Sequence, residues 1–196
     1  MHDTGEITGV KTTLEQVAAM LEEMRRHLTT LSEDQALWLP PGGDVWPIQR
    51  SVTHCVNCEH RAVTELGRAM KGQATPETIP ADTGIFAWFG PTPYALARLV
   101  GDLKRQVEAL SNALDSSHLD VEAVRYPNHP PRKLVDYVEV MRHHTEAHLA
   151  AIKKKLAAVP PAKECDAGVR EAYPNFGRGA EARGTSQTSR SDHSRG

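Results

Sequence analysis

The sequence lacks the features that mark exported and membrane proteins. No apolar run is long enough to span a membrane, and the polar start MHDTGEITGV has no basic stretch followed by apolar residues. Three cysteines in 196 residues do not form the disulfide framework of a small secreted domain. We therefore expect an unexported, cytoplasmic protein that resides in a reducing compartment.

The chain also lacks a marked excess of charge of either sign. Its 23 basic and 25 acidic residues are intermixed and give a formal net charge of -2. Proteins that bind nucleic acid or anionic membranes usually carry a basic patch, so neither partner is expected. With 39% hydrophobic residues, the chain has enough material for one globular domain with its own core.

Apolar residues at helical spacing predict four long helices. They cover about residues 13–32, 47–71, 92–114 and 132–158. Thr12 and Thr13 are candidate caps of the first helix, and Leu99 belongs to the apolar stripe of the third. No strand-like alternation persists. We predict an all-α four-helix bundle of the up-and-down type, with a longer crossover connection left open because two of the loops are long.

Two segments fall outside the helical pattern. The interval between the second and third helices contains Phe86, Trp88 and Phe89, which we expect to cover one end of the bundle with apolar surface. From Pro160 onward, Gly, Ser and Arg replace large apolar residues, so burial cannot offset the entropy of ordering. The predicted organisation is one domain over residues 1–159 and a disordered tail over 160–196.

Two histidines lie within the apolar stripe of the last predicted helix. His144 and His148 are four residues apart, which places them about 40° and one turn, roughly 6 Å, from each other. A buried imidazole without a hydrogen-bond partner destabilises the fold by about 1–3 kcal/mol. A metal ion that binds one nitrogen of each ring removes this cost for both histidines. Ligands in bundles come from different helices. His54, which borders the apolar face at Val52 and Cys55, is the best candidate for a third ligand.

Other residues near the proposed ligands have less direct interpretations. His143 is turned about 100° from His144 and Glu146 about 200°, so both are expected at the surface. Cys58 lies one turn from His54 and could reach the same ion. Cys55 and Cys58 form a CxxC, but within a helix rather than at its start, so buried cysteines acting as small apolar residues are favoured over a redox pair.

The segments VWPIQRSVTHCVNCE and HHTEAHLAAI together resemble the DinB-like, or YfiT-like, family of four-helix bundle proteins. In that family a tryptophan opens the second helix, a histidine follows on the same helix, and an HxxxH on the last helix completes a three-histidine metal site. Trp46, His54, His144 and His148 occupy those places in order. The connecting segments LWLPPGGDVWPI and YPNHPPRKLVDY are similar as well, so the resemblance covers about residues 13–157.

The resemblance implies a metal-dependent enzyme that acts on a small molecule. Three neutral imidazoles around a divalent Zn, Ni or Mn ion leave a position where water or a thiolate can bind. The family's chemistry implies a thiol S-transferase, with a small intracellular thiol as co-substrate, or a hydrolase. The alternative is a non-catalytic, metal-stabilised bundle that acts in an interaction or a stress response. Bundles with an exposed apolar helix face commonly dimerise, so a homodimer is an expected assembly.

Overall fold

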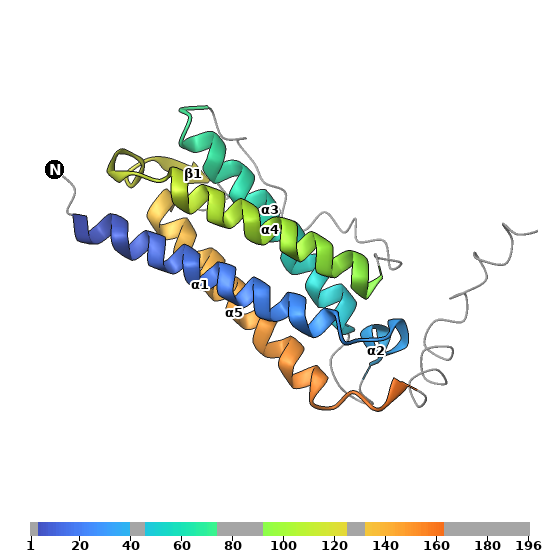
Figure 1. Cartoon of the computed structure of the whole chain (residues 1–196). Coiled ribbons are helices and arrows are strands. Elements are labelled where there is room, and N and C mark those ends of the chain that lie inside the picture. Colours follow the sequence, from blue (N-terminus) through green and yellow to red (C-terminus); the bar gives the residue numbers. More distant parts are fainter. Residues whose placement is uncertain (1–3, 40–45, 74–91, 125–131, 163–196) are drawn as a thin grey trace, which may run out of the picture.

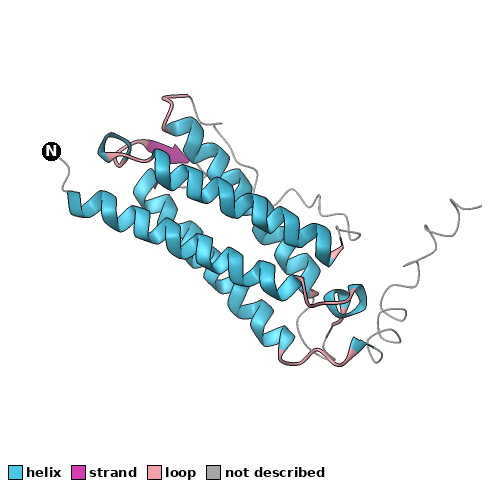
Figure 2. Cartoon of the chain, in the orientation of Figure 1, coloured by secondary structure: helices cyan, strands magenta, loops and turns pink. Residues whose placement is uncertain are grey.

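In the computed structural model, long helices make up most of the residues that the structure describes, which are 4–39, 46–73, 92–124 and 132–162 (Figures 1 and 2). The helices are α1 (Thr4–Leu28), α2 (Glu33–Leu37), α3 (Ile48–Ala69), α4 (Pro93–Ala113) and α5 (Leu134–Leu156). After α4 come the 3-10 turn η1 (Ser116–His118) and the antiparallel strands β1 (Glu122–Val124) and β2 (Arg132–Lys133).

The four long helices form a bundle in which α1 and α3 lie diagonally opposite each other. Both α1 and α3 pack against α4 and α5. In Figure 1, α1 and α5 run in one direction and α3 and α4 in the other. Because α3 and α4 are parallel, a crossover connection rather than a short turn joins them. The all-α four-helix bundle is thus confirmed. The strict up-and-down order was wrong, and the helix directions fit the crossover variant that the long loops left open.

The core consists of apolar side chains spaced three and four residues apart along each long helix. On α1, for example, Leu14, Val17 and Leu21 are 0% exposed, and the stripe extends upstream through Val10. Burial of one such side chain stabilises the fold by about 1.5–3 kcal/mol relative to leaving it in water. These stripes fix the rotation of each helix about its axis, and therefore also fix which polar residues face the interior.

The structure corrects the predicted start of the first helix. Helix α1 begins at Thr4, so Thr12 and Thr13 lie within it and the prediction that they cap it was wrong. Ile7 and Val10 continue the apolar spacing upstream of Leu14, which explains the longer helix. The predicted end was also too late, because α1 stops at Leu28 and the separate helix α2 follows.

Two further corrections concern strands and the third predicted helix. The strands β1 and β2 were not expected, because three and two residues are too short to show alternation. Leu99 was predicted to face the core but is 44% exposed. The stripe of α4 runs through Leu96, Val100 and Leu103, and Leu99 is turned about 100° from Val100.

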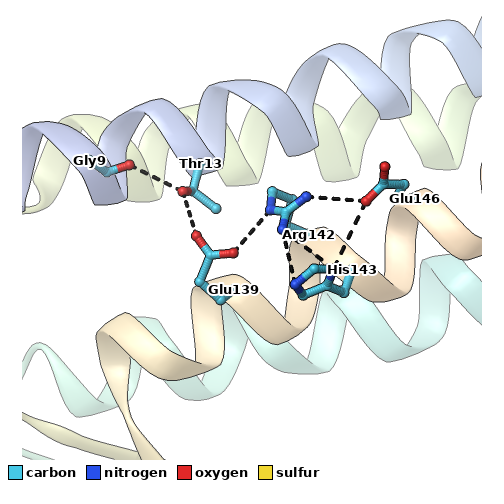
Figure 3. Close-up of polar contacts among 6 residues, drawn as sticks. All are labelled: Gly9, Thr13, Glu139, Arg142, His143 and Glu146. Carbon is cyan, nitrogen blue, oxygen red and sulfur yellow. Dashed lines mark hydrogen bonds and ion pairs between the residues drawn. The ribbon is translucent and has the colours of Figure 1, made fainter.

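A chain of polar contacts joins α1 to α5 on the outer side of the bundle (Figure 3). The Thr13 hydroxyl lies 2.9 Å from Glu139 Oε1, and Arg142 Nε donates to Glu139 Oε2 at 3.0 Å. Arg142 also donates to Glu146 at 3.1 Å and lies beside the ring of His143. Both His143 and Glu146 are exposed, which confirms the expectation that they are surface residues.

Some expectations concern residues that the structure does not describe. Phe86, Trp88 and Phe89 lie outside the described residues, and so does the predicted tail from residue 163 onward. Within the described ranges, none of the helices is both long and apolar enough to cross a membrane.

Candidate metal centre

The antiparallel packing of α3 and α5 brings the three predicted ligands together. His54 comes from the first half of α3, and His144 and His148 lie on either side of the middle of α5. Their ring centroids are 5.5 Å apart for His54 and His144, 5.0 Å for His54 and His148, and 4.5 Å for His144 and His148. The sequence placed these residues on two different helices, and the fold makes them neighbours.

A buried carboxylate that sequence reasoning missed holds the His144 ring. Glu59 of α3 is 2% exposed, and its Oε1 lies 2.6 Å from Nδ1 of His144. Burial raises the pKa of Glu59, while the hydrogen bond from His144 opposes that rise. A carboxylate bonded to one imidazole nitrogen fixes the ring's orientation and tautomer, as it does beside metal-binding histidines. His144 therefore presents Nε2, with its lone pair, to the other histidines.

His148 meets His144 through the opposite ring nitrogen. The two Nε2 atoms are 3.1 Å apart, a distance that suits an N–H···N hydrogen bond as well as two ligand atoms on one ion. Burial is the main cause that lowers the pKa of His148 to about 4, and the neighbouring His144 and His54 lower it further. At neutral pH the His148 ring is thus uncharged, which is the form that binds metals.

Cys58 adds a sulfur to this group. Its Sγ is 3.6 Å from Nε2 of His54, one turn away on α3. His54, Cys58 and His144 each offer a ligand atom within 4.8 Å of the others, and all three residues are partly exposed. His148 is outside this set and contacts it through His144, with 3.1 Å between the two Nε2 atoms. The group thus combines imidazole and thiol donors on partly exposed residues.

A second set of donor atoms lies deeper in the bundle and is less suited to binding a metal ion. Cys55, Glu59 and His144 each also offer a donor atom within 4.8 Å of the other two. However, Glu59 is already bonded to Nδ1 of His144, and burial raises the pKa of the fully buried Cys55 well above its usual range. A neutral, inaccessible thiol is a poor ligand. Cys55 therefore acts as the small apolar core residue that its place on the stripe predicted.

Trp46 lies beside the His54 ring from the segment before α3. The two rings meet edge to face, with centroids 5.2 Å apart, and the guanidinium of Arg50 lies 4.5 Å above the Trp46 ring. The Trp46 ring, on which the Arg50 guanidinium stacks, occupies one side of the His54 imidazole and so restricts its orientation. His54 is thus positioned by Trp46 on one side, while Cys58 follows one turn later on α3.

Comparison with known proteins gives one match. A protein-family model described as the DinB superfamily matches residues 16–152. The matched region runs from within α1 to the last turns of α5, and it includes His54, His144 and His148. Neither curated proteins nor solved structures give a match. Since the family match spans most of the bundle, the chain belongs to the DinB superfamily, whose members are metal-binding helical proteins.

Proposed function

We propose that the chain binds one divalent metal ion between α3 and α5 through His54, His144 and His148. The contact between His144 Nε2 and His148 Nε2, at 3.1 Å, is the observation that carries the proposal. Two imidazole nitrogens on a tetrahedral Zn²⁺ ion, each at 2.0–2.1 Å from it, are about 3.3 Å apart. The nitrogen atoms of His144 and His148 are therefore already near the separation that a shared ion requires.

Neighbouring residues orient the three histidine rings, and burial keeps one of them uncharged. Glu59 holds His144 so that Nε2 faces the other rings, and burial keeps His148 neutral. Trp46 restrains His54 from one side. A divalent ion in such a site supplies Lewis acidity, which lowers the pKa of a bound water toward about 7 or deprotonates a bound thiol. Three imidazoles accept Zn, Ni or Mn, so the metal depends on geometry and availability.

We further propose that the protein is an enzyme that activates a small thiol for transfer to an electrophile, or water for hydrolysis. The partial exposure of His54, His144 and His148 supports this, since a small-molecule substrate can reach them. Thiol transfer is placed first because the resemblance to DinB-like proteins implies it. The cytoplasmic location and the homodimer stay predictions.

Metal analysis of protein purified without an affinity tag tests the site. We expect one divalent ion for each chain, and a higher melting temperature when Zn²⁺, Ni²⁺ or Mn²⁺ is added to metal-free protein. His148→Ala should lose both effects. His143→Ala is the matched control, because it removes an adjacent imidazole whose side chain is 67% exposed. Absence of bound metal together with no stabilisation by any of the three ions would refute the site.

The enzymatic proposal is tested with protein loaded with metal. Several small thiols are assayed with a model electrophile, and the rate should disappear in His148→Ala and persist in His143→Ala. Hydrolysis of model substrates without a thiol is assayed in parallel, because a site that activates water needs no co-substrate.

A metal-stabilised bundle without turnover is the second candidate, and Cys58 favours it. A thiol 3.6 Å from His54 can complete a four-ligand site, and closed sites of this kind are usually structural. This candidate is accepted if the metal is bound and stabilises the fold but neither thiols nor hydrolysis substrates give turnover.

A further inference from the structure

We infer that Cys58 is a fourth protein ligand of this ion, so that the site selects thiophilic divalent ions such as Zn²⁺ and Co²⁺ over Mn²⁺. The inference rests on the proposed function, since the histidines must first hold an ion. It concerns a residue outside the three-histidine pattern, and it narrows the metals that the site accepts.

The position of the sulfur fits a tetrahedral site. With Zn–S near 2.3 Å and Zn–N near 2.0–2.1 Å, a sulfur and a nitrogen on one tetrahedral ion are about 3.6 Å apart. The separation of Cys58 Sγ and His54 Nε2 is 3.6 Å. The other ring nitrogen, Nδ1, is farther from the sulfur, at 4.0 Å. Nε2 of His54 is therefore the nitrogen that pairs with Cys58 at the spacing of two ligands.

The position of the sulfur relative to α5 supports the same conclusion. Cys58 Sγ lies within 4.8 Å of a ring nitrogen of His144 as well as of His54, although His144 comes from a different helix. A thiol that merely contacted the preceding turn of its own helix would meet His54 alone. The sulfur therefore lies on the side of α3 that faces the histidines of α5.

The neighbouring thiol does not share these properties. Cys55 is 0% exposed and belongs to the deeper set with Glu59, whereas Cys58 is partly exposed like the histidines. Within the part of the chain that the structure describes, neither thiol forms a disulfide. Cys55→Ala is therefore the matched control for Cys58→Ala.

Ligand chemistry then decides which metals bind. A thiolate favours thiophilic ions, whereas Mn²⁺ prefers carboxylate, carbonyl and water oxygens. Three imidazoles already favour Zn²⁺ over Mn²⁺, and the sulfur of Cys58 adds to that preference. Cys58 then takes the fourth tetrahedral position, so a substrate thiol would bind as a fifth ligand or displace it. Removal of its side chain should therefore weaken Zn²⁺ binding while it frees that position for an external thiol.

Cobalt substitution tests this inference without an activity assay. Metal-free full-length protein carrying Cys165→Ser, which removes the third thiol, is titrated with Co²⁺ and followed by near-ultraviolet absorption. We expect a sulfur-to-cobalt charge-transfer band in the parent protein and in Cys55→Ala. Cys58→Ala should still bind Co²⁺ through its histidines but lack the band. Its Zn²⁺ affinity should fall at least about tenfold, with Mn²⁺ affinity changed less than about twofold.

A second measurement needs no substitution at position 58. Zn²⁺ should protect Cys58 from alkylation in the otherwise unaltered chain, and fragment-ion mass spectrometry distinguishes it from Cys55. A parent protein that binds Co²⁺ without the band, or a Cys58→Ala variant that keeps it, would overturn the inference and leave the histidine site standing. Failure of the parent to bind either ion would overturn the metal site, and the fourth ligand with it.

Discussion

Replacement of Glu59 by Gln separates metal affinity from fold stability. Gln keeps the size of the side chain and an oxygen that accepts from Nδ1 of His144, but it removes the charge that strengthens the 2.6 Å contact. Burial already disfavours that charge, as the raised pKa of Glu59 indicates. We expect the free energy of unfolding without metal to change by no more than about 1.5 kcal/mol, because the weaker bond and the relieved desolvation oppose each other.

The effect on metal binding should be larger. Loss of a carboxylate that supports a metal-binding histidine typically costs about 10- to 100-fold in affinity. At a Zn²⁺ concentration of about 100 times the parent Kd, the ion adds about 2.7 kcal/mol to the free energy of unfolding. In Glu59→Gln the same concentration should add only about 1.4 kcal/mol for a tenfold loss, or about 0.4 kcal/mol for a hundredfold loss.

Urea denaturation with and without Zn²⁺ measures both quantities in one experiment. Glu65→Gln is the matched control, since Glu65 is also a buried glutamate of α3 but contacts Arg68 instead of His144. Its stabilisation by Zn²⁺ should equal that of the parent. Equal stabilisation of Glu59→Gln and the parent would refute the orienting role of Glu59. An equal loss in Glu65→Gln would mean that any buried charge on α3 has this effect.

Two further predictions concern the bundle itself, each measured as a change in the free energy of unfolding. Leu21→Ala should destabilise by about 2–5 kcal/mol because Leu21 is 0% exposed, whereas Leu99→Ala should change stability by less than about 0.5 kcal/mol. Comparable losses would contradict the orientation of α4. Thr13→Ala should lower the free energy of unfolding by about 0.5–1.5 kcal/mol, because its hydrogen bond to Glu139 is lost. No loss would mean that this contact between α1 and α5 does not contribute to stability.

The sequence predicted the last three long helices to within two residues at each end. Helix α3 was expected at about 47–71 and spans Ile48–Ala69, and α5 was expected at about 132–158 and spans Leu134–Leu156. Their stripes are bounded by Pro and Gly, and Gly72 has the positive φ of 66° expected of a residue that follows a helix. Helix α1 was harder to delimit because its first turns contain few apolar residues.

The site was only partly predictable because its members have different kinds of sequence signal. His144 and His148 were predicted from the apolar spacing of a single helix, and α5 has that spacing in the structure. Which residue of α3 faces them depends on how α3 and α5 are rotated, which the sequence alone does not fix. Glu59 did have a signal, since it takes the place between Cys55 and Ala62 in the apolar spacing of α3.

The distribution of buried polar residues explains why such a site belongs between α3 and α5. Six of the eight buried polar residues in the described core come from these two helices: Gln49, Ser51, Glu59, Glu65, Thr145 and Lys155. Replacing both partners of a buried hydrogen bond by apolar side chains of the same shape is often nearly neutral, so fold stability does not require a carboxylate and an imidazole here. Losing one partner leaves the other polar group without its hydrogen bond, which costs about 1–3 kcal/mol. The Glu59–His144 pair is therefore best explained by what His144 presents on its other nitrogen, which is a ligand atom 3.1 Å from that of His148.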